Sequence, residues 1–303
     1  MQLLYLLEKL RVPILNEFML AITYLGDEIA FLVIALILMW CADKRTGYYI
    51  LSVGFLGTIA NQFMKLWFRI PRPWVLDPNF TILEQAREGA SGYSFPSGHT
   101  QSSVGTFGAI AYITKNKLLR YLCIAAVILV PFSRMYLGVH TPLDVGVATA
   151  MAGVLIFALK PVILGKNEGA FPVFLGIMVA VAVAFMCFVE FYPFPADIDP
   201  HNMESGLKNA YTLLGSLVGL SIVYIVDTKY LHFPTKAVWW AQVIKAAIGF
   251  GLVLAVKSGM KAPLEAVFGA LTGRAVRYFL IVIVAGIVWP LTFEWFAKLG
   301  SKE

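Results

Sequence analysis

The sequence predicts an all-α protein, a polytopic membrane helix bundle of about nine transmembrane helices with an N-terminal amphipathic surface helix. Composition and hydropathy predict this class. Of the 303 residues, 59% are apolar and 14% are charged, against about 25% charged in a typical soluble domain. The mean hydropathy is +0.76. These values exclude a disordered chain and a disulfide-stapled secreted module, and they leave too little charge for the surface of an ordinary soluble enzyme.

Nine apolar stretches are candidates for crossing a bilayer, since a spanning helix needs about 20 apolar residues. They lie at roughly 26–42, 46–66, 99–114, 119–137, 143–161, 171–192, 209–227, 236–256 and 277–297. The third is short, and the eighth contains Lys245. Residues 1–25 mix apolar runs with charged residues and Pro13, so we expect an amphipathic helix on the membrane surface there. Residues 259–273 could form a short re-entrant or interfacial helix.

Lysine and arginine in the short loops predict the orientation, because cytoplasmic loops carry an excess of them. Most of these residues fall on one side, namely Lys44, Arg45, Lys115, Lys117, Arg120, Lys160, Lys166, Lys229, Lys236, Lys298 and Lys302. Four basic residues on the other side weaken the difference: Lys257, Lys261, Arg274 and Arg277. We therefore expect a cytoplasmic C-terminus and an extracytoplasmic or lumenal 67–98 loop.

The three cysteines, Cys41, Cys123 and Cys187, each lie inside an apolar run. The simplest interpretation is that each of the three is buried and packs as a small apolar residue. With no C-x-x-C pair and no Cys/His cluster, the sequence predicts no metal site.

A first cluster of polar residues closes the second apolar stretch. Lys65 and Arg72 are seven residues apart, so they share one helix face if the helix persists to Arg72. Two cations on one face can hold one multiply charged anion, and a guanidinium suits phosphate oxygens. Pro71 and Pro73 fix the exit of the chain. The alternative is that both cations reach for lipid head groups, as cations at span ends commonly do.

A second cluster, Pro96-Ser97-Gly98-His99, opens the third stretch. Ser97 suits a helix N-cap, and Gly98 lets a ligand approach the backbone. The free N–H groups of a helix start favour an anion. His99 can carry a proton near neutral pH. An ordinary N-cap with an incidental interfacial histidine is the alternative.

A third cluster spans the end of the fourth stretch and the start of the fifth. Arg134 lies within the last turns of an apolar helix, where an unpaired cation is costly, so we expect an anionic partner. His140 and Asp144 are four residues apart. A carboxylate there can accept the N–H of one imidazole nitrogen and leave the other as a nucleophile. Alternatively, Asp144 only caps the helix.

All three clusters fall on the same predicted membrane face. The residues that could converge on one site are Lys65, Arg72, Ser97, Gly98, His99, Arg134, His140 and Asp144. They offer cations for phosphate charge, N–H groups for its oxygens and two histidines for attack and proton transfer. Phosphoryl transfer needs mainly positioning and charge stabilisation, and this set supplies both.

The motifs K-x6-R-P, P-S-G-H and S-R-x5-H-x3-D, between Lys65 and Asp144, resemble the three-part signature of the type 2 phosphatidic acid phosphatase superfamily. The resemblance implies a metal-independent phosphatase that works through a phosphohistidine and needs no cofactor. Together with the surface helix that the residue pattern predicts (1–25), it divides the chain into a phosphatase core (26–165) and a C-terminal extension of about four transmembrane helices (166–303). The signature does not reach the extension, which could shape substrate access or form the contact of a homodimer.

Carried over residue by residue, the resemblance implies His140 as the nucleophile, Asp144 as the residue that orients it, and His99 as general acid and then base. The phosphate-binding set it implies is Lys65, Arg72, Ser97, Gly98 and Arg134. We expect a lipid phosphate or diphosphate as substrate (phosphatidate, isoprenoid diphosphate or sphingoid phosphate), membrane lipids as partners, and no nucleic acid. The alternatives are a soluble sugar phosphate, as in glucose-6-phosphatase, a lipid phosphotransferase and, less favoured, a transporter.

Overall fold

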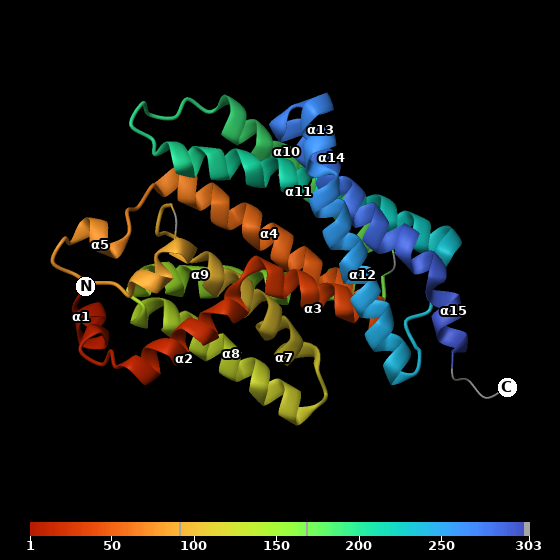
Figure 1. The fold of residues 1–303 in the computed structure, drawn as a ribbon, viewed down its shortest axis with the longest axis horizontal. Coiled ribbons are helices and arrows are strands. Elements are labelled where there is room, and N and C mark those ends of the chain that lie inside the picture. Colours follow the sequence, from red (N-terminus) through yellow and green to blue (C-terminus); the bar gives the residue numbers. More distant parts are fainter. Residues whose placement is uncertain (91, 168, 300–303) are drawn as a thin grey trace. The chain divides into compact units, whose positions relative to one another are not determined.

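The computed structural model describes residues 1–90, 92–167 and 169–299, and within these ranges all regular structure is helical (Figure 1). The α-helices are α1 (Gln2–Glu8), α2 (Pro13–Thr23), α3 (Glu28–Cys41), α4 (Lys44–Phe68), α5 (Pro73–Leu76), α6 (Gly98–Ser103), α7 (Ala109–Ile113), α8 (Lys117–Tyr136), α9 (Pro142–Ile163), α10 (Ala170–Phe191), α11 (Pro200–Val226), α12 (Trp239–Gly259), α13 (Lys261–Phe268), α14 (Ala270–Ile283) and α15 (Phe293–Lys298). The predicted all-α class is therefore correct. Lys302, used in the orientation argument, lies outside the described residues.

Six helical segments of the described chain are long and apolar enough to cross a membrane: 117–136, 142–163, 170–191, 200–231, 239–259 and 270–298. A seventh results if Pro13–Gly26 and Glu28–Cys41, which meet at 53°, form one bent span. The protein is thus an integral membrane protein with several apolar helices. The predicted count of nine is not confirmed, because α4 and the α6–α7 segment form where spans were expected but are not among these six.

The N-terminal stretch differs from the single amphipathic helix expected over 1–25. It contains two helices, and Pro13 at the first turn of α2 starts the second one, since proline fits a helix start but not its interior. The Tyr5 hydroxyl donates to Asp77 at 2.8 Å, and Arg11 donates to the Thr81 carbonyl at 2.8 Å. The N-terminal stretch therefore packs against the long loop that follows α4.

The chain divides into two compact units. Unit 1 comprises Met1–Ile34, Ile50–Pro161 and Pro195–Glu204, and unit 2 comprises Ala35–Tyr49, Val162–Phe194 and Ser205–Glu303. All three polar clusters of the sequence lie in unit 1. In α6–α7 a π-helical segment (η4, Val104–Gly108) joins the two helices, so the third predicted span is one short helix over 98–113 with a π-helical middle.

Unit 2 contains Lys245, the cation near the middle of the eighth predicted span. This side chain is fully buried, and its Nζ donates to the carbonyls of Trp40 at 2.8 Å and Thr235 at 3.1 Å. It also lies 4.5 Å from the centroid of the Phe293 ring. Lys245 thus stabilises the end of α3, which accounts for its charge without the transported ion that a transporter would require.

Candidate active site

His140 and Asp144 come together where α8 ends and α9 begins. The chain turns through Gly138, whose φ of +83° favours glycine, and Asp144 lies in the first turn of α9. The His140 and Asp144 side chains are 2% and 1% exposed, and His140 Nδ1 lies 3.4 Å from Asp144 Oδ2. The predicted i, i+4 pair therefore forms.

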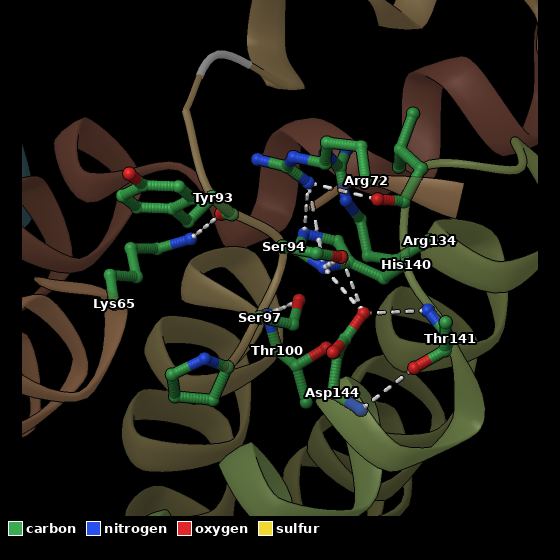
Figure 2. A network of polar contacts seen from close by, with 12 residues as sticks. Lys65, Arg72, Tyr93, Ser94, Ser97, Thr100, Arg134, His140, Thr141 and Asp144 are labelled. Carbon is green, nitrogen blue, oxygen red and sulfur yellow. Dashed lines mark hydrogen bonds and ion pairs between the residues drawn. The ribbon is translucent and has the colours of Figure 1, made fainter. Parts of the chain in front are cut away.

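The Asp144 carboxylate also accepts two further hydrogen bonds at Oδ2. The backbone N–H of Thr141 donates at 2.7 Å and the Ser94 hydroxyl donates at 2.6 Å. Ser94 Oγ in turn lies 3.4 Å from His140 Nδ1. The carboxylate therefore completes a capping box with Thr141 at the start of α9, and it is also the centre of a buried network (Figure 2).

Arg72 determines which nitrogen of His140 carries the lone pair and which carries the proton. Its Nη1 lies 2.9 Å from His140 Nε2, and it also donates to the Val139 carbonyl at 2.9 Å. A guanidinium can only donate, so Nε2 must accept, and the imidazole proton is on Nδ1, toward Asp144 and Ser94. This tautomer presents the Nε2 lone pair beside a cation.

Burial holds the pKa of His140 well below its usual range, and the positive charge of Arg72 lowers it further. The imidazole is therefore neutral at neutral pH. Burial also lowers the pKa of Arg72, to about 10, although Asp144 opposes the effect. The guanidinium consequently keeps its charge at neutral pH, and a neutral nucleophilic nitrogen lies next to a permanent cation.

Lys65 and Arg72 converge, but not along a continuous helix. α4 ends at Phe68, and Arg69 follows with a φ of +50°, because Pro71 and Pro73 prevent the helix from continuing. The chain then turns back, and the Nε of Arg72 donates to the Gly92 carbonyl at 2.9 Å. The condition for a shared helix face, a helix that persists to Arg72, is therefore not met.

Ser97 caps α6, as predicted, and its Oγ accepts the Thr100 N–H at 3.4 Å. Its own N–H donates to the Asp144 carbonyl oxygen at 3.2 Å, which ties the second cluster to the third. His99, in the first turn of α6, pairs through Nε2 with Asp27 Oδ1 at 2.8 Å. Asp27 lies between Gly26 and α3, where the bent pair of helices meets.

Arg134 is 1% exposed, and its guanidinium donates to Thr23 Oγ1 at 2.6 Å and to the Gly89 carbonyl at 3.4 Å. Both partners are neutral oxygens, so these bonds do not supply the anionic partner expected from the sequence. The Nε of Arg134 has no hydrogen-bond partner among the described residues. One buried donor on this cation therefore remains for another group.

A cavity of about 370 Å³ opens beside these residues. Five of the eight predicted site residues line this cavity: Lys65, Arg72, Gly98, His99 and His140. The other three, Ser97, Arg134 and Asp144, are not among the lining residues. Ser97 bonds within α6, Arg134 donates to Thr23 and Gly89, and Asp144 accepts from Thr141 and Ser94 while it lies 3.4 Å from His140.

Residues 92–94 connect the site to the second polar loop. The Tyr93 carbonyl accepts from Lys65 Nζ at 2.5 Å, and the Tyr93 N–H donates to Asn202 Oδ1 at 2.7 Å. The Tyr93 hydroxyl accepts the Asp199 N–H at 3.3 Å. The start of α11, which the sequence placed in the C-terminal extension, therefore holds the loop that positions Lys65 and Arg72.

Sequence reasoning missed Ser94, Asp27 and Asn202. Ser94 lies in a loop rich in serine and glycine, where no pattern separates one hydroxyl from another. Asp27 is a carboxylate just ahead of an apolar run, which is a common helix-start residue. Asn202 lies more than 100 residues from Tyr93, beyond the range of any periodicity.

Two family models match the chain: the PAP2 superfamily over residues 45–168, and the PAP2 superfamily phosphatase transmembrane extension over residues 211–302. Phosphatidylglycerophosphatase B of Bacillus subtilis is 30% identical over 165 residues, which cover 50% of this chain and 76% of that protein. The undecaprenyl-diphosphatase of Sulfolobus acidocaldarius is 28% identical over 45% of this chain and 64% of its own length.

A probable sphingosine-1-phosphate phosphatase of Dictyostelium discoideum is 31% identical over 43% of this chain, but only 35% of that protein is covered. No solved structure matches the chain. The first family match contains all three polar clusters, and the second covers most of α11 to α15. The chain therefore belongs to the PAP2 superfamily, as its three-part motif predicts, and it carries that superfamily's transmembrane extension.

Proposed function

We propose that this protein is an integral-membrane phosphatase that hydrolyses a phosphate monoester or diphosphate of a lipid through a phosphohistidine. The observation that carries the proposal is the buried His140 imidazole, with its Nε2 lone pair beside Arg72 and its Nδ1 toward Asp144. The relatives support it, since their names describe phosphatases of phosphatidylglycerophosphate, sphingosine 1-phosphate and undecaprenyl diphosphate.

In the first half-reaction, Nε2 of His140 attacks phosphorus and the bond to the leaving oxygen breaks. His99 donates its proton to that oxygen, so a monoester releases the neutral alcohol and a diphosphate releases the lipid monophosphate. The negative charge of Asp144 stabilises the positive charge that develops on the His140 ring. Lys65, Arg72 and the Gly98 backbone hold the non-bridging oxygens, and Ser97 and Arg134 complete the phosphate-binding set.

In the second half-reaction, His99 removes a proton from water, and the resulting hydroxide attacks the phosphorus of the phosphohistidine. The P–N bond breaks, inorganic phosphate leaves, and His140 regains its Nε2 lone pair. Every proton is accounted for by His99 and water. The scheme needs no metal, because cationic side chains supply the charge stabilisation.

For the membrane arrangement, we infer that α4 and the α6–α7 segment also cross the bilayer, which brings the count to about nine, and that α1 and part of α2 lie at the interface. The basic loops favour an extracytoplasmic or lumenal active site and a cytoplasmic C-terminus. The division at residues 25 and 165, and a homodimer formed through the extension, remain predictions. Cysteine cross-linking and labelling from each side of sealed vesicles would test them.

Release of inorganic phosphate from short-chain phosphatidate by purified protein in detergent, with a chelator present, tests the proposed function. We expect turnover, with radiolabel from the substrate phosphate transiently bound in an acid-labile form, as expected of a phosphohistidine. Transfer of the label to an acceptor lipid, with no phosphate in solution, would favour a phosphotransferase. Flux across proteoliposomes without hydrolysis would contradict an enzyme altogether.

The pH dependence of kcat/KM should be bell-shaped. His140 must be neutral to attack, and its pKa lies well below the ordinary value, so the rate falls only as the pH drops through that lowered pKa. The alkaline limb reports loss of the His99 proton. Asp27→Asn removes the carboxylate that pairs with His99, so the alkaline limb should move to lower pH. Rate measurements over about pH 4 to 9 would contradict two-histidine catalysis if the profile were flat.

Asn202→Ala should lower kcat/KM about tenfold, because supporting residues of this kind typically contribute tenfold or more. The substitution removes the acceptor that holds the Tyr93 N–H, and the loop carrying the carbonyl partners of Lys65 and Arg72 loosens. Asn79→Ala, an exposed asparagine on the same long loop, is the matched control and should retain full activity. Equal activity of the two variants would contradict a positioning role for Asn202.

A further inference from the structure

The cavity beside His140 extends past the phosphate-binding residues along a wall of uncharged polar side chains. Thr58, Asn61 and Gln62 of α4 and Gln101 and Ser102 of α6 line it. No step of phosphoryl transfer proposed above uses these five residues. Polar side chains in helices of a membrane protein are costly unless they meet a partner, so this wall requires an explanation.

The wall continues the phosphate site on both helices. Thr58, Asn61 and Gln62 precede Lys65 by seven, four and three residues, so they share the helix face of Lys65. Ser102 follows His99 by three residues, one turn further along α6. His99 is the residue that protonates the leaving oxygen, so a wall next to it contacts the leaving alcohol rather than the phosphate.

Two residues of this wall have buried polar atoms without a partner. Gln101 and Ser102 are 2% and 7% exposed, and neither Gln101 Nε2 nor Ser102 Oγ has a hydrogen-bond partner in the described part of the chain. Buried polar side-chain atoms are normally hydrogen-bonded, so each exception requires an explanation, such as an ordered water or a bound molecule. Asn61 bonds to the protein through one side-chain atom: its Nδ2 donates to the Pro96 carbonyl at 3.2 Å.

The five side chains of this wall are polar and uncharged, and this property favours some leaving groups over others. A second phosphate would need further cations, but these five side chains are neutral. Apart from the four residues assigned to the phosphate and the proton transfer, the titratable residues that line the cavity are acidic, Asp27 and Glu28. A plain hydrocarbon would leave the amides and hydroxyls unpaired. An alcohol with several hydroxyl groups can donate to and accept from amides and hydroxyls alike.

We propose that Thr58, Asn61, Gln62, Gln101 and Ser102 form a subsite for the hydroxyl groups of the leaving alcohol, so that the preferred substrate is the phosphomonoester of a polyhydroxy alcohol. This proposal rests on the proposed phosphatase function. The alcohol is either a glycerol-type head group attached to a lipid or a free polyol such as a sugar. Both present the same chemistry to the wall, and they differ in the acyl chains that reach the bilayer.

Wild-type kcat/KM should be compared for four phosphate donors in detergent with a chelator: dihexanoyl phosphatidylglycerophosphate, glucose 6-phosphate, dihexanoyl phosphatidate and farnesyl diphosphate. We expect at least a tenfold preference for a hydroxyl-bearing donor over phosphatidate and farnesyl diphosphate. Preference for the first donor identifies a lipid-linked polyol, and preference for the second a free sugar phosphate. Equal or higher kcat/KM for phosphatidate or farnesyl diphosphate would overturn the subsite while leaving the phosphatase function intact, whereas release from none of the four would contradict the function itself.

Ser102→Ala provides a second, independent measurement. It should reduce the preference for the hydroxyl-bearing donor about tenfold, because it removes one hydrogen-bonding group from the subsite. Ser103→Ala is the matched control, since Ser103 is buried on the same helix but donates to the Thr100 carbonyl and does not line the cavity. If Ser102→Ala changed kcat/KM equally for all donors, or if Ser103→Ala reduced the preference as much, the subsite would be wrong.

Discussion

His140→Ala should lower kcat for phosphate release by at least about 10⁴-fold, because it removes the atom that forms the covalent bond to phosphorus. General acid catalysis by His99 and charge stabilisation by Lys65 and Arg72 would remain, but they have no nucleophile to assist. The measurement is single-turnover phosphate release, together with trapping of radiolabelled protein. No labelled phosphohistidine should accumulate in the variant.

The fold should survive this change. Arg72 retains its bonds to the Val139 and Gly92 carbonyls, and Asp144 retains those from Ser94 and Thr141. The thermal unfolding midpoint should therefore change little. His201→Ala, an exposed histidine, is the control and should leave kcat unchanged. If His140→Ala kept full phosphate release without added metal, the mechanism would be wrong.

The sequence predicts the site better than it predicts the membrane topology. Residue types with fixed spacing identify the three clusters, and the structure brings them together in unit 1. The partners that orient them come from elsewhere in the chain: Asp27 from the break before α3, Ser94 from the loop and Asn202 from α11. Such contacts depend on the tertiary fold, so neither periodicity nor motif spacing can reveal them.

The composition of α4 explains why the number of membrane-spanning helices is difficult to predict. Thr58, Asn61 and Gln62 lower the apolar character of this helix, and these are the residues that line the cavity. A helix that contributes a polar face to an active site loses the continuous apolar signal by which spans are recognised. The same features therefore make α4 hard to assign as a span and useful as one wall of the site.

The end of a helix is harder to predict from residue spacing than the residue types of a site are. The spacing of Lys65 and Arg72 suggested one continuous face, yet the two cations line one cavity because the chain turns back after Phe68. Arg134 donates to the neutral oxygens of Thr23 and Gly89, and its anionic partner stays a prediction. For Lys65 and Arg72 the residue type is informative, and the geometry comes from a backbone turn that spacing does not encode.

Asp144→Asn should lower kcat about 10³-fold with little change in KM, a loss comparable to that seen when a histidine nucleophile or base loses its carboxylate partner. Asparagine can still accept from Thr141 or Ser94 through its oxygen. It cannot supply the negative charge that stabilises the ring as the P–N bond forms. Because Lys65 and Arg72 still bind the phosphate, the loss should appear in kcat.

Ser94→Ala separates charge from hydrogen bonding in the same network. It removes the 2.6 Å bond to Asp144 Oδ2 and leaves the carboxylate and its Thr141 bond in place, so we expect a loss of only about tenfold, as for one supporting hydrogen bond. Asp197→Asn, an exposed aspartate, controls for loss of a carboxylate. If Asp144→Asn lost no more activity than Ser94→Ala, hydrogen bonding alone would account for the role of Asp144, and the stabilising charge on the phosphohistidine would have to come from another group.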